Sequence, residues 1–254
     1  MRILVTFAIE TEFAPWVTLR KFEKRVLAAD LEVYEAECGG NTLWVFLTGM
    51  GPGFRPGFFQ LGMFAAKAGV ETVISSGLAG SLRKEHRIGE VIAPRHIATL
   101  RDAAGFSANA GLVRLSKEHG AKVVDTLVTA DHIIETGEEK SRLARFADAV
   151  DMESNRVMQE FALANLPVAT IRAISDESDE DLPIDFAECL TPEGKVKALP
   201  LLRQLLLSPS RVPHLVRFGV RSKRAAAALA EFLDSFVKTL TPQAIKSDLG
   251  VSAE

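Results

Sequence analysis

The sequence predicts an α/β fold, in which strands and helices alternate along one chain. Short runs of apolar, β-branched residues recur and are separated by segments in which apolar residues have helical spacing. This alternation is typical of a largely parallel sheet with helices on both faces. The composition agrees, because 47% of the 254 residues are hydrophobic and 25% are charged, as in proteins that fold around a core. We therefore expect an α/β sandwich.

Charge and cysteine content exclude several classes of protein. The net charge is −3, so no basic field attracts phosphate backbones and we expect no nucleic-acid partner. No apolar run has the length of a membrane span or the form of a signal peptide, and we expect a soluble, cytoplasmic protein. Cys38 and Cys189 lie far apart and match no disulfide or metal spacing. We expect reduced packing residues and no metal site.

Seven runs have the apolar and β-branched composition of buried strands. They lie at residues 2–8, 31–38, 42–48, 71–76, 91–97, 121–129 and 168–173. The second and third runs are separated by Gly39, Gly40 and Asn41, and this turn sequence predicts a hairpin.

Helices are expected between the strands and after the last one. They lie at residues 13–22, 57–68, a segment ending near 146, 154–164, one turn within 182–190, 192–207 and 222–240. Pro15 stands near the start of the first helix, where its missing N–H does no harm. Asp151 precedes the helix at 154, where an acidic group complements the helix dipole. Pro209 and Pro213 are expected to break the chain before the last helix.

The chain is expected to form one domain over residues 1–241. Residues 182–220 are an apolar and basic helical insertion in it, and 242–254 are expected to be a flexible tail. Residues 99–111 are rich in Ala, Gly, Ser and Asn and predict a long loop, a feature that is often functional.

An acidic segment follows the last predicted strand. Apolar residues stop there and a run of carboxylates begins at Asp176, with Arg172 and Ser175 beside it. Ligands of open α/β sheets bind outside the carboxyl ends of strands. Asp176 is therefore a candidate for chemistry, and a solvated acidic loop is the alternative.

Two glycine-rich loops also follow predicted strands, at 49–53 and 76–80. Such loops let backbone amides approach a ligand closely, although neither is a phosphate-binding Walker loop. The sheet could bring both loops to one edge together with Glu12, Glu153 and Asp176. This edge would form a cleft for a polyhydroxylated ligand.

Five segments carry a family resemblance over residues 2–180. They are FAIETEF, TGMGPG, SSGLAG, VDMES and IRAISD. In order and spacing they resemble the nucleoside phosphorylase and nucleosidase superfamily, and most of all its methylthioadenosine/S-adenosylhomocysteine nucleosidase branch. The resemblance implies a three-layer α/β/α sandwich with a mixed, partly barrel-like sheet, and a homodimer or higher oligomer. It also implies cleavage of the N-glycosidic bond of a nucleoside, with no cofactor.

The resemblance assigns a role to Asp176 in this reaction. Asp176 would be the general acid that holds or protonates N7 of a purine, and Ser175 would orient its carboxyl group. Neighbouring carboxylates such as Glu177 and Asp179 are expected to favour the protonated form by like-charge repulsion.

The resemblance also assigns residues that would bind the sugar and activate the water. Met152 would pack against the ribose, and Glu153 would accept hydrogen bonds from its hydroxyl groups. Glu12 would be the general base that activates water, with Glu10 as the alternative. Gly51 and Gly77 would place the nucleophile loops.

Two departures from the family pattern bear on the nucleophile. Phosphorylases of this superfamily have an arginine just before the second glycine loop, where this chain has Ser75, and a polar contact where it has Leu78. Glu12 would repel phosphate, so we expect a hydrolase, with Arg172 holding the water or opposing Glu12. A phosphorylase using Arg172 and the Gly51 and Gly77 amides, or a non-catalytic nucleoside-binding protein, are the alternatives.

Two further departures concern the substrate. Where the nucleosidases have a Phe that stacks on adenine, this chain has Ile133, so weaker apolar packing is expected against the base. The insertion is similar to that of hopanoid-associated nucleosidases, which release adenine from a nucleoside with a large apolar 5′ group.

Overall fold

A computed structural model describes residues 1–28, 31–51, 54–55, 57–191 and 195–246 of the chain. Its strands are β1 (Arg2–Phe7), β2 (Glu23–Ala28), β3 (Leu31–Cys38), β4 (Asn41–Leu47), β5 (Thr72–Ser81), β6 (Val91–Thr99), β7 (Phe106–Ser107), β8 (Lys122–Thr129), β9 (Ala149–Asp151) and β10 (Val168–Asp176). Its α-helices are α1 (Glu10–Leu19), α2 (Phe58–Lys67), α3 (Ala110–Glu118), α4 (Gly137–Leu143), α5 (Ser154–Leu163), α6 (Phe186–Cys189), α7 (Ala198–Leu207), α8 (Val212–Phe236) and α9 (Pro242–Lys246).

All ten strands belong to one mixed sheet. Its order is β10-β6-β8-β9-β5-β1-β4-β3-β2, β7 pairs with β6, and β10 also pairs with β5. Strands β5, β10, β6, β8 and β9 therefore close into a ring, from which β1, β4, β3 and β2 extend as an open sheet. This arrangement confirms the mixed, partly barrel-like sheet that the family resemblance implies.

The sheet is less parallel than the apolar pattern predicts, because five of the ten strand pairings among the described residues are parallel and five are antiparallel. Strands β2–β3, β3–β4, β5–β9, β6–β7 and β6–β10 pair antiparallel. The predicted hairpin at β3–β4 is confirmed. Two of the other antiparallel pairs, β5–β9 and β6–β10, join segments that are distant in the chain, and a local apolar pattern carries no information on the direction in which such strands meet.

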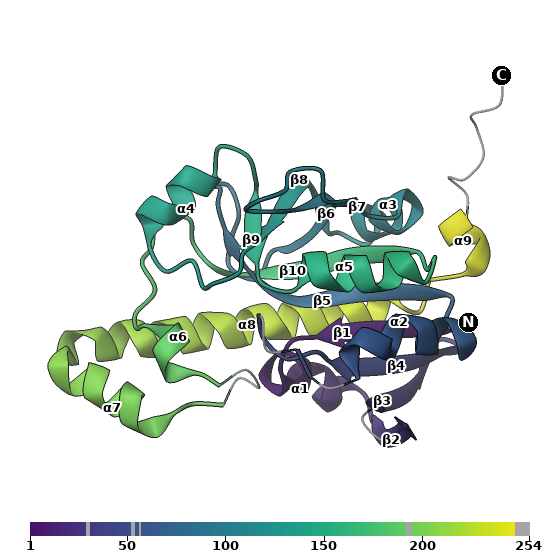
Figure 1. Ribbon diagram of the computed structural model, residues 1–254, viewed down its shortest axis with the longest axis horizontal. Coiled ribbons are helices and arrows are strands. Elements are labelled where there is room, and N and C mark those ends of the chain that lie inside the picture. Colours follow the sequence, from purple (N-terminus) through teal and green to yellow (C-terminus); the bar gives the residue numbers. More distant parts are fainter. Residues whose placement is uncertain (29–30, 52–53, 56, 192–194, 247–254) are drawn as a thin grey trace.

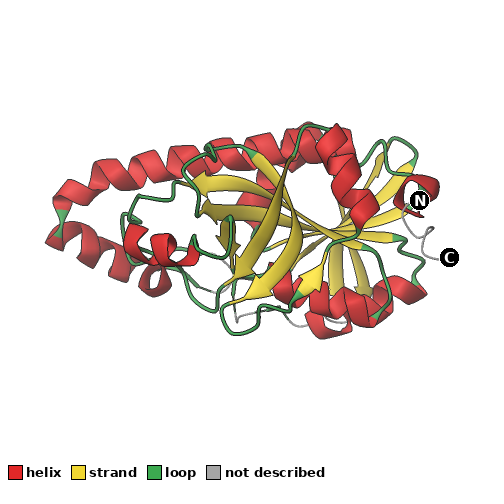
Figure 2. Cartoon of the chain, turned by 90° about the horizontal axis from the view of Figure 1, so that it is seen from above, coloured by secondary structure: helices red, strands yellow, loops and turns green. Residues whose placement is uncertain are grey.

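Helices cover both faces of the sheet, as Figures 1 and 2 show. Alternate residues of β1 point to opposite faces, so Ile3 packs in the core that includes Leu229 and Phe236 of α8, whereas Leu4 packs in the core that includes Leu61 of α2. Cys38 and Cys189 are buried and unpaired. These contacts give the α/β/α layers.

The helical insertion differs from the prediction. Pro213 does not interrupt the last helix, because it lies in the first turn of α8. A backbone N–H in the first turn would have no acceptor within the helix, so its absence in proline costs nothing there. Ser208 and a 3₁₀ turn at Pro209–Arg211 separate α7 from α8. The predicted helix start at 192–194 lies outside the described residues.

Several short elements have no strong sequence signal. Strand β2 is mostly exposed and charged, so it lacks the apolar pattern of a strand, and it pairs only with β3 at the sheet edge. The expected loop at 99–111 contains β7 and the start of α3, which Asn109 caps by accepting a hydrogen bond from Leu112 N–H. The segment expected as a tail begins with α9, whose Ile245 is buried. None of the described helices combines the length and apolarity that crossing a membrane requires.

Candidate active site

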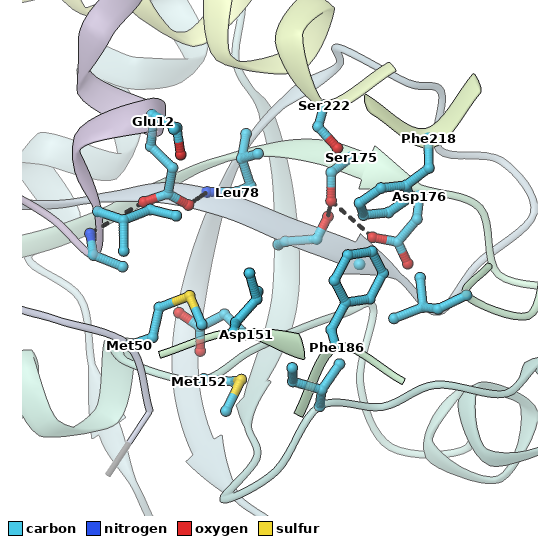
Figure 3. A pocket seen from close by; sticks show the side chains of 18 of the residues that line it. Glu12, Met50, Leu78, Asp151, Met152, Ser175, Asp176, Phe186, Phe218 and Ser222 are labelled. Atoms are coloured by element: carbon cyan, nitrogen blue, oxygen red, sulfur yellow. Dashed lines mark hydrogen bonds between the residues drawn. The ribbon is translucent and has the colours of Figure 1, made fainter. Parts of the chain in front are cut away.

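A cavity of about 490 Å³ lies where β5, β9 and β10 end and α1 begins. Six residues predicted for the site line it, and Figure 3 shows most of this wall. They are Glu12, Ile133, Met152, Glu153, Ser175 and Asp176. The other three, Gly51, Gly77 and Arg172, lie behind the wall and contact its residues.

Glu12 stands in the first turn of α1, at one side of the cavity. Its carboxylate accepts hydrogen bonds from the backbone N–H groups of Ala8 (3.1 Å) and Leu78 (3.0 Å). Burial raises the pKa of Glu12, and the Leu78 N–H and the charge of Arg172 oppose part of that rise. The alternative base, Glu10, is exposed to solvent. Leu78 therefore holds Glu12 through its backbone, although its side chain is apolar.

Gly77 allows Arg172 and Glu12 to lie against the same stretch of β5. Its φ is +149°, and a Cβ there would lie 2.9 Å from Nη1 of Arg172 and 3.2 Å from a carboxylate oxygen of Glu12. A side chain at this position would displace both groups. The close approach of Arg172 and Glu12 therefore requires glycine at this position, next to the predicted base.

Arg172 is almost fully buried and is held by polar partners. Its Nε and Nη2 donate to Oδ2 of Asp151 at 2.9 and 2.7 Å, and Nη2 also donates to the hydroxyls of Ser75 and Ser154. Among the described residues Nη1 has no hydrogen-bond partner, and it faces Gly77 and Glu12. The sequence predicts Asp151 only as a helix-initiating residue, and the ion pair adds a second role.

Gly51 belongs with the predicted ribose residues. Its N–H donates to Oε1 of Glu153 at 2.9 Å. Its φ is +53°, and a Cβ there would lie 2.7 Å from Cε of Met152. The structure thus gives the Gly51 amide to Glu153 and not to the Glu12 side of the cavity; residues 52–53 of this loop lie outside the described residues.

Glu153 is one of three carboxylates at this part of the cavity. Burial, together with the negative charges of Asp151 and Glu12, raises the pKa of Glu153 to about 8. The charge of Arg172 and the Gly51 N–H oppose the rise. Glu153 therefore keeps its proton at neutral pH, because its burial and the neighbouring carboxylates disfavour the ionised form.

Asp176 lies at the end of β10, on the side of the cavity away from Glu12 (Figure 3). The hydroxyl of Ser175, the residue expected to orient it, donates to its Oδ1 at 2.7 Å. A cation that the sequence analysis missed, Lys140 of α4, donates to its Oδ2 at 2.6 Å.

Lys140 is fully buried. Its ammonium group also donates to the carbonyl oxygens of Glu177 (2.8 Å) and Glu180 (3.0 Å). A single lysine in a polar helical segment gives no sequence signal that it points inward, which explains why it was missed. Its three acceptors fix it against Asp176.

The expected like-charge environment of Asp176 is wrong. The carboxylates of Glu177 and Glu180 pair with Arg221 of α8, and Asp179 lies 3.8 Å from Lys84. The nearest charged group to Asp176 is the Lys140 ammonium. These acidic residues, which follow Asp176 in the sequence, therefore pair with other cations, Arg221 and Lys84.

Aromatic side chains from the insertion lie beside Asp176. The rings of Phe186 and Phe218 are 5.0 Å apart between centroids, and Figure 3 shows both at the cavity. Ile133 lines the same cavity. The cavity beside Asp176 therefore contains two aromatic rings from residues outside the family motifs. Nothing in the sequence indicates that these two residues reach the cavity, because the insertion contains no recognisable motif.

His132 also lines the cavity, next to Ile133. It hydrogen-bonds Asp131 and Glu139, and these carboxylates raise its pKa. Within the described part of the chain no group of three or more His, Cys, Asp or Glu side chains is arranged to hold a metal ion.

A partly closed mixed sheet with a carboxylate-lined cavity at its strand ends defines the class of protein, the nucleoside phosphorylase and nucleosidase fold. Residues 2–206 match the model of the Phosphorylase superfamily. The chain belongs to this superfamily.

Similar proteins are nucleosidases by name. The 5′-methylthioadenosine/S-adenosylhomocysteine nucleosidase of Shewanella sediminis is 25% identical over 231 residues, covering 81% of this chain and 99% of the relative. The Buchnera aphidicola protein of the same name is 28% identical over 141 residues, covering 46% of this chain and 61% of the relative. A structure of a futalosine hydrolase mutant of Helicobacter pylori has a TM-score of 0.69 and 20% identity, over 94% of this chain and all of that one. The structural likeness concerns the fold.

Proposed function

We propose that this protein is a nucleosidase that hydrolyses the N-glycosidic bond of a purine nucleoside with a 5′-substituted ribose. One observation carries the proposal: Glu12 and Asp176, the predicted base and acid, line one cavity from opposite sides (Figure 3). The names of the similar proteins support the same reaction class.

Asp176 acts on the leaving group. As the bond between C1′ and the purine nitrogen breaks, its electron pair moves to the purine, and Asp176 gives a proton to N7. General acid catalysis of this kind typically contributes ~10²–10⁴-fold. The Lys140 ammonium at 2.6 Å stabilises the carboxylate that remains on Asp176, because an adjacent opposite charge favours the ionised form.

Glu153 and Met152 hold the sugar. Hydrogen bonds from ribose hydroxyls favour the ionised form of the Glu153 carboxyl, against the burial that raises its pKa to about 8. The negative field of Glu12, Asp151 and Glu153 stabilises the positive charge that develops on the sugar ring.

Glu12 activates water. It takes a proton from the water molecule while the oxygen bonds to C1′, so the products are the free purine and a reducing sugar. The raised pKa of Glu12 makes its carboxylate a stronger base than a solvated glutamate. Fixed backbone donors hold it in place.

Phosphate is a poorer nucleophile for this site than water. Arg172 is paired with Asp151, and the Gly51 amide is used by Glu153. One observation favours a phosphorylase as the second candidate: Nη1 of Arg172 has no partner among the described residues, so it could donate a hydrogen bond to phosphate. The adjacent Glu12 carboxylate would repel an anion bound there.

The apolar part of the cavity supports a substrate with an apolar 5′ group. The insertion contributes six apolar side chains to it, those of Leu182, Phe186, Leu190, Val196, Leu215 and Phe218. We further propose one domain over residues 1–241 with the insertion at 182–220, a homodimer or higher oligomer, and action in the cytoplasm.

The direct test measures free adenine after incubation with adenosine and 5′-alkylthioadenosines, with and without phosphate. The proposal predicts release at the same rate in both conditions, and faster release from the apolar 5′ analogues. Strict dependence on phosphate would make the protein a phosphorylase. Binding without release would make it a nucleoside-binding protein.

A further inference from the structure

A helical hairpin projects from the body of the molecule. It consists of residues 195–224, which include α7, the 3₁₀ turn and the first half of α8. Figures 1 and 2 show α7 and this half of α8 side by side, extending beyond the sheet, with the turn between them at the far end. We call these residues the α7–α8 hairpin.

The hairpin exposes large apolar side chains. Leu199, Leu206 and Leu207 are 81%, 71% and 73% exposed. In α7 the exposed residues recur at 199, 202 and 206, and in α8 at 212, 216 and 220, so each helix presents an apolar stripe along one side. Eight of the sixteen large hydrophobic side chains exposed in the described residues lie here. An apolar surface concentrated in this way marks an interaction site.

The hairpin is also strongly basic. Residues 195–224 contain eight Lys and Arg residues and no Asp or Glu, in a chain whose net charge is −3. Among the residues that the structure describes, only Arg221 of these eight has a carboxylate within ion-pair distance. The others, including Arg203 and Arg211, keep their charge for an external anion.

We infer that the α7–α8 hairpin docks on the surface of an anionic lipid bilayer. Exposed leucines and valines beside unpaired Arg and Lys are the features that place an amphipathic helix in the interface of such a membrane. A basic surface complements anionic headgroups, and the apolar stripes enter the boundary below them. The tip is suited to first contact, because Leu206, Leu207 and Arg211 flank its turn.

The inner side of the same hairpin forms part of the cavity wall. Leu215, Phe218 and Ser222 line the cavity, while Val216 and Val220 of the same helix are exposed. Docking therefore brings one wall of the cavity next to the lipid surface. This relation is geometric and does not depend on the proposed reaction.

The test is co-sedimentation of the full chain with vesicles of phosphatidylcholine alone and of phosphatidylcholine mixed with phosphatidylglycerol. We expect binding to the mixed vesicles only, and weaker binding as salt rises. The double variant Leu199→Asp, Leu206→Asp and the double variant Arg203→Glu, Arg211→Glu should each bind at least ~10-fold more weakly. The matched control is Val26→Asp, on an exposed residue of β2, which should bind like the unaltered chain.

Circular dichroism and adenine release from a soluble nucleoside report whether the variants remain folded, since none of the altered residues lines the cavity. Failure to bind either vesicle, or equal binding by the hairpin variants and the control, would overturn the inference. A loss of self-association in the leucine variant, without vesicle binding by the unaltered chain, would assign the hairpin to contacts between protein copies instead. Vesicle binding is measured without turnover, so its failure is distinct from failure of the proposed function.

Discussion

The two sides of the cavity hold their carboxyl groups in different ways. On the Glu12 side, backbone N–H groups hold the carboxylates of Glu12 and Glu153, and the nearby cation, Arg172, is paired with Asp151. Carboxyl groups therefore outnumber cations there. This side is suited to a sugar that becomes positive and to a water that must lose a proton.

On the other side, a buried cation and a hydroxyl hold Asp176. Lys140 and Ser175 each contact one of its oxygens. This side is suited to a group that gains negative charge as a proton leaves. The difference teaches that the two sides can stabilise opposite changes of charge at the two ends of one breaking bond.

The largest expected effect comes from removing the acid. Asp176→Asn should lower kcat by about 10²–10⁴-fold, because the leaving purine loses its proton donor, while the substrate Kd changes little. Steady-state release of adenine and equilibrium binding measure the two quantities. Asp179→Asn, on a carboxylate that faces solvent near Lys84, is the control. Near-normal turnover of Asp176→Asn would remove the leaving-group role.

The next largest effect concerns the base. Glu12→Gln should lower hydrolysis by at least about 10²-fold, since the amide keeps the shape but does not accept the proton of water. Glu10→Gln, on the exposed neighbour, should leave the rate unchanged. The same assay applied to both variants decides between them, and a loss confined to Glu10→Gln would assign the base to that residue.

A smaller effect sharpens the contrast between the two sides. Lys140→Met should lower kcat/KM by about 10-fold to 10²-fold and move the alkaline limb of its pH profile to higher pH. Loss of an adjacent cation favours the protonated form of a carboxyl group. Lys84→Met, on an exposed lysine, should change neither. A uniform loss of rate with an unmoved profile would mean that Lys140 serves the fold alone.

The smallest effect is on stability. Folding raises the pKa of Glu153 from 4.5 to about 8, so between these values the folded chain holds a proton that the unfolded chain has released. Stability therefore falls as pH rises through this window. Glu153→Gln should remove that dependence and raise Tm by about 2–4 °C at pH 8 relative to the unaltered chain, with little change near pH 5. Thermal unfolding at both pH values measures it, and an equal shift at both would contradict the charge argument.

The sequence predicts those site residues that lie at or near the ends of strands. Glu12, Glu153 and Asp176 each follow or adjoin an apolar strand, and the pattern that buries those strands also brings their ends to one edge. The family motifs then add roles that no local pattern contains. The buried strands of the fold are predicted as well, because they have strong apolar signals, whereas the exposed strand β2 is not.

The rest depends on contacts that no local pattern encodes. Lys140 is one lysine among polar residues of α4, and it points inward only because three acceptors, from the last residue of β10 and the segment after it, surround it. Phe186 and Phe218 come together across the insertion. The pair of Asp151 with Arg172 joins β9 to β10. Each is a tertiary contact between distant segments.

The most direct test of the account follows the oxygen of the nucleophile. We expect turnover of a 5′-alkylthioadenosine in H₂¹⁸O, with phosphate present, to give free adenine and a reducing sugar that carries one ¹⁸O at C1′, as measured by mass spectrometry. A sugar 1-phosphate without ¹⁸O on the sugar carbon would contradict hydrolysis, and with it the role of Glu12 as the base that activates water.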